Sequence, residues 1–106
     1  MRFSEKDWKI FRRKIVGWQE DYMDRMIREY IGLLTTDEDP STRFWNLDER
    51  IRQDKKKAGV QARMSRSNMF NILLMLLDED AITLEDLSEF SEDLQECIKN
   101  VASWHE

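Results

Sequence analysis

The pattern of apolar and polar positions predicts helices along most of the chain. From Trp8 to Leu33, apolar side chains recur every three or four residues, which is the period of an α-helix. Ser4 is a favourable N-cap for this helix, with Asp7 three residues further on. Extra apolar positions widen the stripe in its second half, which we therefore expect to be more enclosed than the first: Val16, Met23, Ile27, Ile31 and Leu34.

A second helix is predicted to begin at Pro40. Residues 35–41 have the composition of a loop, and Asp39 followed by Pro40 is a typical helix start. We expect this helix to run to about Lys57, because Gly59 is a natural C-terminal stop. Its apolar residues share one face: Phe44, Leu47 and Ile51.

The most apolar stretch is Met69–Leu77, in which eight of nine positions are apolar although 37% of the chain is charged. Nine helical residues rise only about 14 Å, less than half the thickness of a bilayer core. A helix that is apolar all round must be surrounded by protein. We therefore predict that this third helix is the buried centre of the fold, with Ser65 and Ser67 as alternative N-caps.

A capping box formed by Thr83 and Asp86 predicts a fourth helix from that point. Its apolar stripe comprises Leu87, Phe90, Leu94, Cys97, Val101 and Trp104, with Leu84 and Ile98 beside it. Four helices with short connections predict an all-α fold. We expect a small antiparallel bundle of about four helices, with a long N-terminal helix and a buried apolar third helix, as one domain over residues 1–106.

Composition narrows the class of protein. Glycine and proline are scarce, at 3 and 1 residues, which argues against strands and hairpins. Cys97 is the single cysteine, so no intramolecular disulfide can form. The N-terminus reaches charged residues before any apolar run, and no segment is long enough to span a membrane. These features predict a cytoplasmic protein.

Catalytic and cofactor chemistry is not indicated. A zinc site needs several cysteine or histidine ligands, and the chain has one of each, Cys97 and His105. The acidic turn before Ile82 is similar to the end of a calcium loop, but Met75 and Leu77 would occupy positions that require carboxylates. There is no glycine-rich phosphate loop. The sequence therefore predicts no enzyme activity, no metal and no cofactor.

Charge is divided along the chain, whose net charge is −5. Residues 50–66 carry seven basic side chains against Asp54 alone, whereas residues 67–98 contain no lysine or arginine. Nine carboxylates fall within residues 78–96. Partner contact is predicted at aromatic, basic and acidic residues: Trp45, Arg50, Glu85, Glu89, Glu92, Asp93 and Glu96. Trp45 adjoins Phe44, so the two rings cannot face the same neighbour; an exposed interface anchor and a bulky closure of one bundle end are equal alternatives.

The basic stretch is the candidate nucleic-acid contact, through Arg52, Lys55, Lys56, Lys57, Arg63 and Arg66. Its alternative is a solvated helix end that pairs with the acidic C-terminal third. Residues 65–69 (SRSNM) resemble the start of the second helix of ribbon-helix-helix repressors. The alternating strand that should precede the first helix of that fold is missing from the sequence.

Three segments carry a broader resemblance: 3–9 (FSEKDWK), 64–69 (MSRSNM) and 82–90 (ITLEDLSEF). As a whole the chain is similar to a set of small, uncharacterised helical proteins from bacteria, often carried on mobile elements. The resemblance implies a compact cytoplasmic helical protein that serves a mobile element. It brings no activity or site residues with it.

The favoured hypothesis is a non-enzymatic protein-binding module, a small adaptor or inhibitor, whose partner has a basic surface. One alternative is an anti-defence, anti-CRISPR-like inhibitor whose acidic face mimics nucleic acid. A second is a DNA-binding regulator that uses residues 50–66. A self-associating structural protein, driven by the long first helix, is a further class.

Overall fold

The computed structural model describes residues 3–103, and within that range it is helical, without strands. The prediction of an all-α fold is confirmed. Trp104, which was predicted to lie in the fourth helix, and His105, which was considered as a zinc ligand, lie outside the described residues. The elements are α1 (Glu5–Leu34), α2 (Pro40–Asp54), η1 (Arg66–Asn68), α3 (Met69–Asp78), η2 (Leu84–Leu87) and α4 (Glu92–Ser103), of which η1 and η2 are short 3₁₀ turns.

Helix α1 is one continuous rod of 30 residues, uninterrupted by Gly17 or Gly32. The hydroxyl of Ser4 accepts a hydrogen bond from the backbone N–H of Asp7 at 3.1 Å, so the predicted N-cap is formed. A helix of this length extends for about 45 Å, and the longest dimension of the molecule is 52 Å. The other helices therefore pack along α1.

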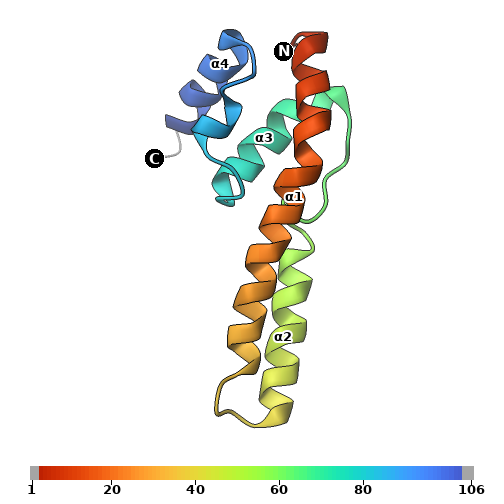
Figure 1. The fold of residues 1–106 in the computed structure, drawn as a ribbon, viewed down its shortest axis with the longest axis vertical. Coiled ribbons are helices and arrows are strands. Elements are labelled where there is room, and N and C mark those ends of the chain that lie inside the picture. The colour runs from red at the N-terminus through yellow and green to blue at the C-terminus, as the bar shows by residue number, and fades with distance from the viewer. Residues whose placement is uncertain (1–2, 104–106) are drawn as a thin grey trace.

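The helices divide between the two halves of α1 (Figure 1). Helix α2 runs back along the C-terminal half, and the two form an antiparallel pair that we call the hairpin. Helices α3 and α4 lie beside the N-terminal half. The arrangement is thus a helical hairpin at one end and a packed cluster at the other, in place of four helices side by side along one axis.

The apolar core lies in the cluster of α1, α3 and α4. Its buried side chains come from all three helices and from the connections between them: Ile10, Phe11, Ile15, Ala58, Met69, Ile72, Leu73, Leu76, Ile82, Leu87, Phe90, Leu94 and Ile98. Each large side chain buried in this way stabilises the fold by roughly 1.5–3 kcal/mol. The core is therefore concentrated on the first half of α1.

The expectation that the second half of α1 is the more enclosed is wrong. Ile27, Ile31 and Leu34 are between 39% and 56% exposed. The reason lies in α2, whose one buried residue is Asp54 and whose predicted packing residue Phe44 is exposed. A helix with so little apolar surface cannot cover both flanks of α1.

Helix α3 is buried on one face, not all round. Met69, Ile72, Leu73 and Leu76 lie in the core, whereas Met75 is 45% exposed. The helix is entered through η1, and the hydroxyl of Ser65 accepts from the N–H of Asn68 at 3.2 Å. Of the two predicted caps, Ser65 is the one used.

Two helix boundaries differ from the prediction. Helix α2 ends at Asp54, not near Lys57. The capping box of Thr83 and Asp86 is formed, but it opens the 3₁₀ turn η2 and not α4. Helix α4 begins after Ser91, whose N–H and hydroxyl both donate to the buried carboxylate of Asp7, at 2.8 and 2.6 Å. The same hydroxyl accepts from the N–H of Leu94 at 3.2 Å, so Ser91 caps α4 and ties that cap to α1.

The connection between α2 and α3 is held against α1. The carboxylate of Glu79, at the end of α3, accepts from the N–H groups of Ala58 at 2.9 Å and Gly59 at 3.0 Å. Gly59 lies directly against the ring of Tyr22 on α1, which leaves no room for a side chain. We call this contact of residues 58–59, Glu79 and Tyr22 the joint.

Substituting Gly59 tests the joint. In Gly59→Ala the new Cβ would lie 2.5 Å from Cδ2 of Tyr22, so the ring or the backbone must move. Overpacking of this kind costs about 1–3 kcal/mol of unfolding free energy, which would appear as a lower urea midpoint by circular dichroism.

Gly17→Ala and Gly32→Ala are matched controls, because a Cβ at either position meets nothing within 4 Å. Each should stabilise the protein by about 0.5–1 kcal/mol, since alanine is the better helix former. A Gly59→Ala midpoint equal to that of these controls would contradict the close contact with Tyr22.

Candidate partner-binding surfaces

A buried carboxylate joins the two helices of the hairpin. The side chain of Asp54 is 2% exposed and accepts from the hydroxyl of Tyr30 at 2.6 Å and from Nε of Arg50 at 3.0 Å. Nζ of Lys57 lies 3.4 Å from its other oxygen. Arg50 also donates to Glu29 of α1 at 2.8 Å. This polar network stands where an apolar seam would lie in a conventional helix pair.

The network shifts the pKa values of its members. Burial alone would raise the pKa of Asp54, but the hydrogen bond from Tyr30 and the charges of Arg50 and Lys57 outweigh it and hold that pKa below its usual range. Burial and the hydrogen bond to Asp54 raise the pKa of Tyr30 to about 12. Asp54 is therefore a stable anion and Tyr30 a permanent donor near neutral pH.

The predicted partner contact Arg50 lies inside this network. Its guanidinium contacts Glu29 and Asp54 and lies 5.8 Å from the centroid of the Tyr30 ring. The hydrogen bond to Glu29 outweighs the effect of burial and raises the pKa of Arg50. Arg50 thus holds α2 against α1, and a partner could recruit it only by displacing these contacts.

Trp45 is exposed, so the alternative of a bulky residue closing one end of the bundle does not apply. Trp45 and Phe44 are 61% and 62% exposed. Their rings meet edge to face, with centroids 5.0 Å apart and planes at 85°, an arrangement that aromatic pairs prefer. Trp45 therefore presents its ring to solvent with Phe44 as support.

Three apolar residues of α1 lie on the same side of the hairpin as Phe44. Met26 and Tyr30 lie toward α2 on α1, where they contact Arg50 and Asp54. Arg43 lies toward α1 on α2, where it donates to the carbonyl of Leu34. In each helix, the residue that follows one of these contact residues is rotated by about 100° around the helix axis, away from the neighbouring helix. Because the two helices are antiparallel, this rotation points to the same side of the hairpin in both. The residues on this side are Ile27, Ile31, Leu34 and Phe44, and Trp45 adjoins them through the contact of its ring with Phe44. We call these five residues the hairpin apolar surface.

The sequence assigned the α1 members of this surface to the core. Their helical spacing showed that they share a face, but not which element would cover it. A signal was present in α2, in which Leu47 and Ile51 are the only aliphatic side chains apart from Pro40 and most other positions are charged or polar. A helix of that composition cannot bury a widened stripe.

The predicted acidic contacts lie around η2 and the first turns of α4. Glu85, Glu92, Asp93 and Glu96 are exposed. Glu89 is also exposed, but it pairs with Arg13 and with Lys14 of α1, the latter at 3.4 Å. Four of the five carboxylates therefore form an acidic surface, and Glu89 ties its edge to α1.

The basic stretch does not form one surface, and its expected pairing with the acidic C-terminal third is not what the structure shows. Its ion pairs are made with α1 and α2: Arg50 with Glu29 and Asp54, Arg52 with Asp48, Lys57 with Asp54, and Arg66 with Glu5. Arg66 also lies 5.9 Å from the Trp8 ring centroid. Lys55, Lys56 and Arg63 are exposed without an ion pair in the described chain. Three such cations on a turn and a linker make a small footprint for a nucleic-acid backbone.

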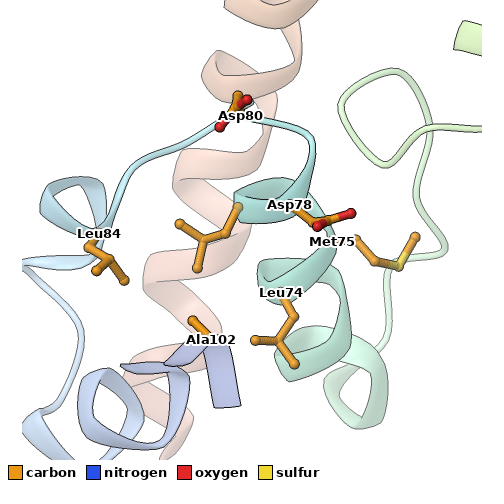
Figure 2. Close-up of a pocket in the computed structure, with 7 residues that line it drawn as sticks. Leu74, Met75, Asp78, Asp80, Leu84 and Ala102 are labelled. Carbon is orange, nitrogen blue, oxygen red and sulfur yellow. The ribbon is translucent and has the colours of Figure 1, made fainter. Parts of the chain in front are cut away.

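A surface pocket of about 770 Å³ lies between α3, η2 and the end of α4 (Figure 2). Leu74, Leu84 and Ala102 line it, with the carboxylates of Asp78 and Asp80 at its margin. The described part of the lining carries no side-chain hydrogen-bond donor. It therefore lacks the convergent polar groups that orient a small ligand.

Residues 3–103 contain no group of three or more histidine, cysteine, aspartate or glutamate side chains that is placed to hold a metal ion. None of the helices described is both long and apolar enough to cross a membrane. Comparison of the chain with models of known protein families, with curated proteins and with solved structures found no match. Function must therefore be inferred from the surfaces themselves.

The low pKa of Asp54 predicts a pH dependence of stability. The pKa of Asp54 in the folded protein lies below its value of about 3.9 in the unfolded chain. The charged carboxylate therefore stabilises the fold fully above about pH 3.9, and this stabilisation is lost as the pH falls through the pKa of the folded state. In urea titrations between about pH 6 and pH 2.5, the unfolding free energy of the wild type should fall more steeply than that of Asp54→Asn.

Asp48→Asn serves as the control, because Asp48 makes an ion pair with Arg52 in the same helix but has a side chain 38% exposed. Its slope should follow that of the wild type, since exposed pairs contribute little. Parallel slopes for the wild type and Asp54→Asn would show that the buried network carries no excess charge stabilisation.

Proposed function

We propose that the protein is a non-enzymatic protein-binding module, a small adaptor or inhibitor, that binds its partner through the hairpin apolar surface. The observation that carries this proposal is the adjacent pair Phe44 and Trp45, each more than 60% exposed on a regular helix. Contiguous apolar patches on a protein surface mark interaction sites. Tryptophan is among the residues that most often dominate binding energy.

The aromatic pair is held ready for binding. Helix α2 is fixed to α1 through Asp54, Arg50 and the bond from Arg43 to the carbonyl of Leu34 at 2.9 Å. The edge-to-face contact restricts both rings. Because little ordering remains to be done on association, more of the contact energy is retained as affinity.

The polar chemistry of the chain is used in holding the fold, which supports a role without catalysis. The groups with shifted pKa values all belong to the network between α1 and α2: Tyr30, Arg50, Asp54 and Lys57. The other fully buried carboxylate, Asp7, accepts two hydrogen bonds from Ser91. The proposal needs no cofactor, and it places the module in the cytoplasm, in keeping with the resemblance to helical proteins of bacterial mobile elements.

Removing the aromatic pair should weaken the partner complex. A partner is first isolated by pulldown from a bacterial lysate, with nuclease treatment in one arm to separate protein from nucleic-acid bridging. Phe44→Ala and Trp45→Ala should each raise the dissociation constant by about 10-fold or more, as anchors of an interface do. Titration calorimetry measures the change.

Thr42→Ala is the control, because Thr42 is exposed on the same helix and its side chain makes no hydrogen bond with the described residues. All three variants should keep urea midpoints near that of the wild type, since the substituted side chains are largely exposed. Equal affinity of the aromatic variants and Thr42→Ala would exclude the hairpin apolar surface as the binding site. Loss of the partner on nuclease treatment would instead favour a nucleic-acid-binding regulator.

The acidic surface supports a second candidate, an anti-CRISPR-like inhibitor that mimics nucleic acid. No lysine or arginine occurs between residues 67 and 98, and Glu92, Asp93 and Glu96 are exposed on adjacent turns of α4. An array of carboxylates on a rigid helix can occupy a basic channel by electrostatic complementarity. This candidate uses the end of the molecule opposite to the hairpin.

Charge reversal separates the two candidates. The double variant Glu92→Lys with Glu96→Lys should abolish binding to a basic partner and remove its salt dependence, because both charges lie on the proposed contact. Asp37→Lys with Glu49→Lys makes the same change in net charge on exposed residues of the hairpin and should leave that binding intact. Unchanged affinity of the first variant by calorimetry would rule out the mimic.

A further inference from the structure

We propose that the occupant of the hairpin apolar surface is a second copy of this chain. The inference rests on the proposed function, in that it takes this surface to be a protein interface, and it names the partner. Two hairpins would pack face to face about a two-fold axis parallel to α1 and α2. The product is a four-helix arrangement at the centre of a symmetric dimer.

The surface has no cover within its own chain. The apolar stripe of α1 continues beyond the hairpin to Val16, which is 63% exposed. Phe11 and Trp18, which pack into the α3 and α4 cluster, lie on the opposite side of α1 by the 100° rotation per residue. Figure 1 shows α3 and α4 beside the N-terminal half of α1, away from the hairpin end. The stripe therefore lies open along the other side.

The exposed area is close to what a stable dimer requires. The stripe from Val16 to Leu34 is about 27 Å long. With Phe44 and Trp45, its exposed side chains offer about 700 Å², against about 800 Å² per partner in a standard interface. Partly exposed neighbours on both helices, among them Met23, Leu47 and Ile51, add to this area. An apolar patch of this size exceeds that of most monomers.

Part of the charge that borders the surface is already paired within each helix. Asp24 of α1 pairs with Arg28, and Arg52 of α2 pairs with Asp48. Glu20 on α1 and Lys55 after the end of α2 make no ion pair among the described residues. The pairing of Glu29 with Arg50 fixes the relative level of the two helices, and Asp24 then lies at the level of residues 52–55. A two-fold axis along the hairpin keeps these levels and places Glu20 and Asp24 of one copy opposite Lys55 of the other.

The same two-fold axis places apolar side chains of one copy against apolar side chains of the other. Leu34 and Arg43 lie at one level, since Arg43 donates to the carbonyl of Leu34. The rotation therefore brings Phe44 over the partner's Leu34, an aromatic ring on an aliphatic side chain. Trp45 then covers the border of the contact and excludes water from it. A different protein would need both the same spacing of apolar side chains and charges opposite to those that border the surface.

The test is the mass of the full chain in solution. Analytical ultracentrifugation up to about 100 µM should give twice the monomer mass of 12.9 kDa for the wild type. Ile27→Glu with Ile31→Glu should raise the dimer dissociation constant at least about 100-fold, because it would bury charges in an apolar contact. Both positions are more than half exposed, so the variant should keep the wild-type circular dichroism spectrum.

Met64→Glu is the matched control, an exposed apolar residue in the linker, and it should remain dimeric. A charge exchange tests the geometry: Asp24→Lys should weaken the dimer, and adding Lys55→Asp should restore it. A monomeric wild type at the highest concentration overturns the proposal, as does a dimer that Ile27→Glu with Ile31→Glu leaves intact. If the wild type is monomeric but Phe44→Ala abolishes its binding to a different protein, the proposal of a dimer is contradicted. The proposed function as a protein-binding module would then still stand.

Discussion

The carboxylate of Glu79 provides the contact on which the rest of the structure depends. It accepts hydrogen bonds from the N–H groups of Ala58 and Gly59. These bonds connect the end of α3 to the segment that follows α2. Charged acceptors form the stronger class of hydrogen bond. Without this contact the cluster and the hairpin would be connected rigidly through α1 alone.

Side chains of α1 complete the joint from the other side. The amide of Gln19 donates to the carbonyl of Ala58 at 2.9 Å, and Arg25 donates to the carbonyl of Asp80 at 2.6 Å. Tyr22 packs on Gly59 between them. Three successive turns of one helix thus hold two chain segments that lie about twenty residues apart. This explains how a chain of 106 residues keeps an elongated shape in which only one end has an apolar core.

What the sequence could predict depended on how local the cause was. The caps at Ser4 and Ser65 and the proline that opens α2 act on the backbone within three residues, and these predictions were correct to the residue or to a choice of two. The box at Thr83 was also correct as a cap. It did not show that α4 would start later, at Ser91, whose hydroxyl caps Leu94 and also donates to Asp7, 84 residues away in the chain.

The candidate surfaces divide in the same way. Adjacent rings at Phe44 and Trp45 required that one of them leave the core, so exposure was visible in the sequence as an alternative. The spacing of Arg50 and Asp54, four residues apart on one helix, likewise permits the ion pair that the structure shows. The contact of Arg50 with Glu29, and the exposure of Ile27 and Ile31, depended on which half of α1 each helix covers, and no local pattern contains that information.

The uncovered flank of α1 follows from the polar character of the hairpin. A buried network of Asp54, Tyr30 and Arg50 gives α2 a fixed position and register, as buried polar groups can, but it removes the apolar area that would stabilise the pair by itself. The apolar area that remains exposed on the hairpin apolar surface is roughly 700 Å². At about 25 cal/mol per Å², burying it would contribute on the order of 17 kcal/mol of gross association energy. Most of that is offset by the entropy lost on binding and by ordering of side chains. A partner of the hairpin would therefore have to match the charges that border this flank as well as its apolar side chains.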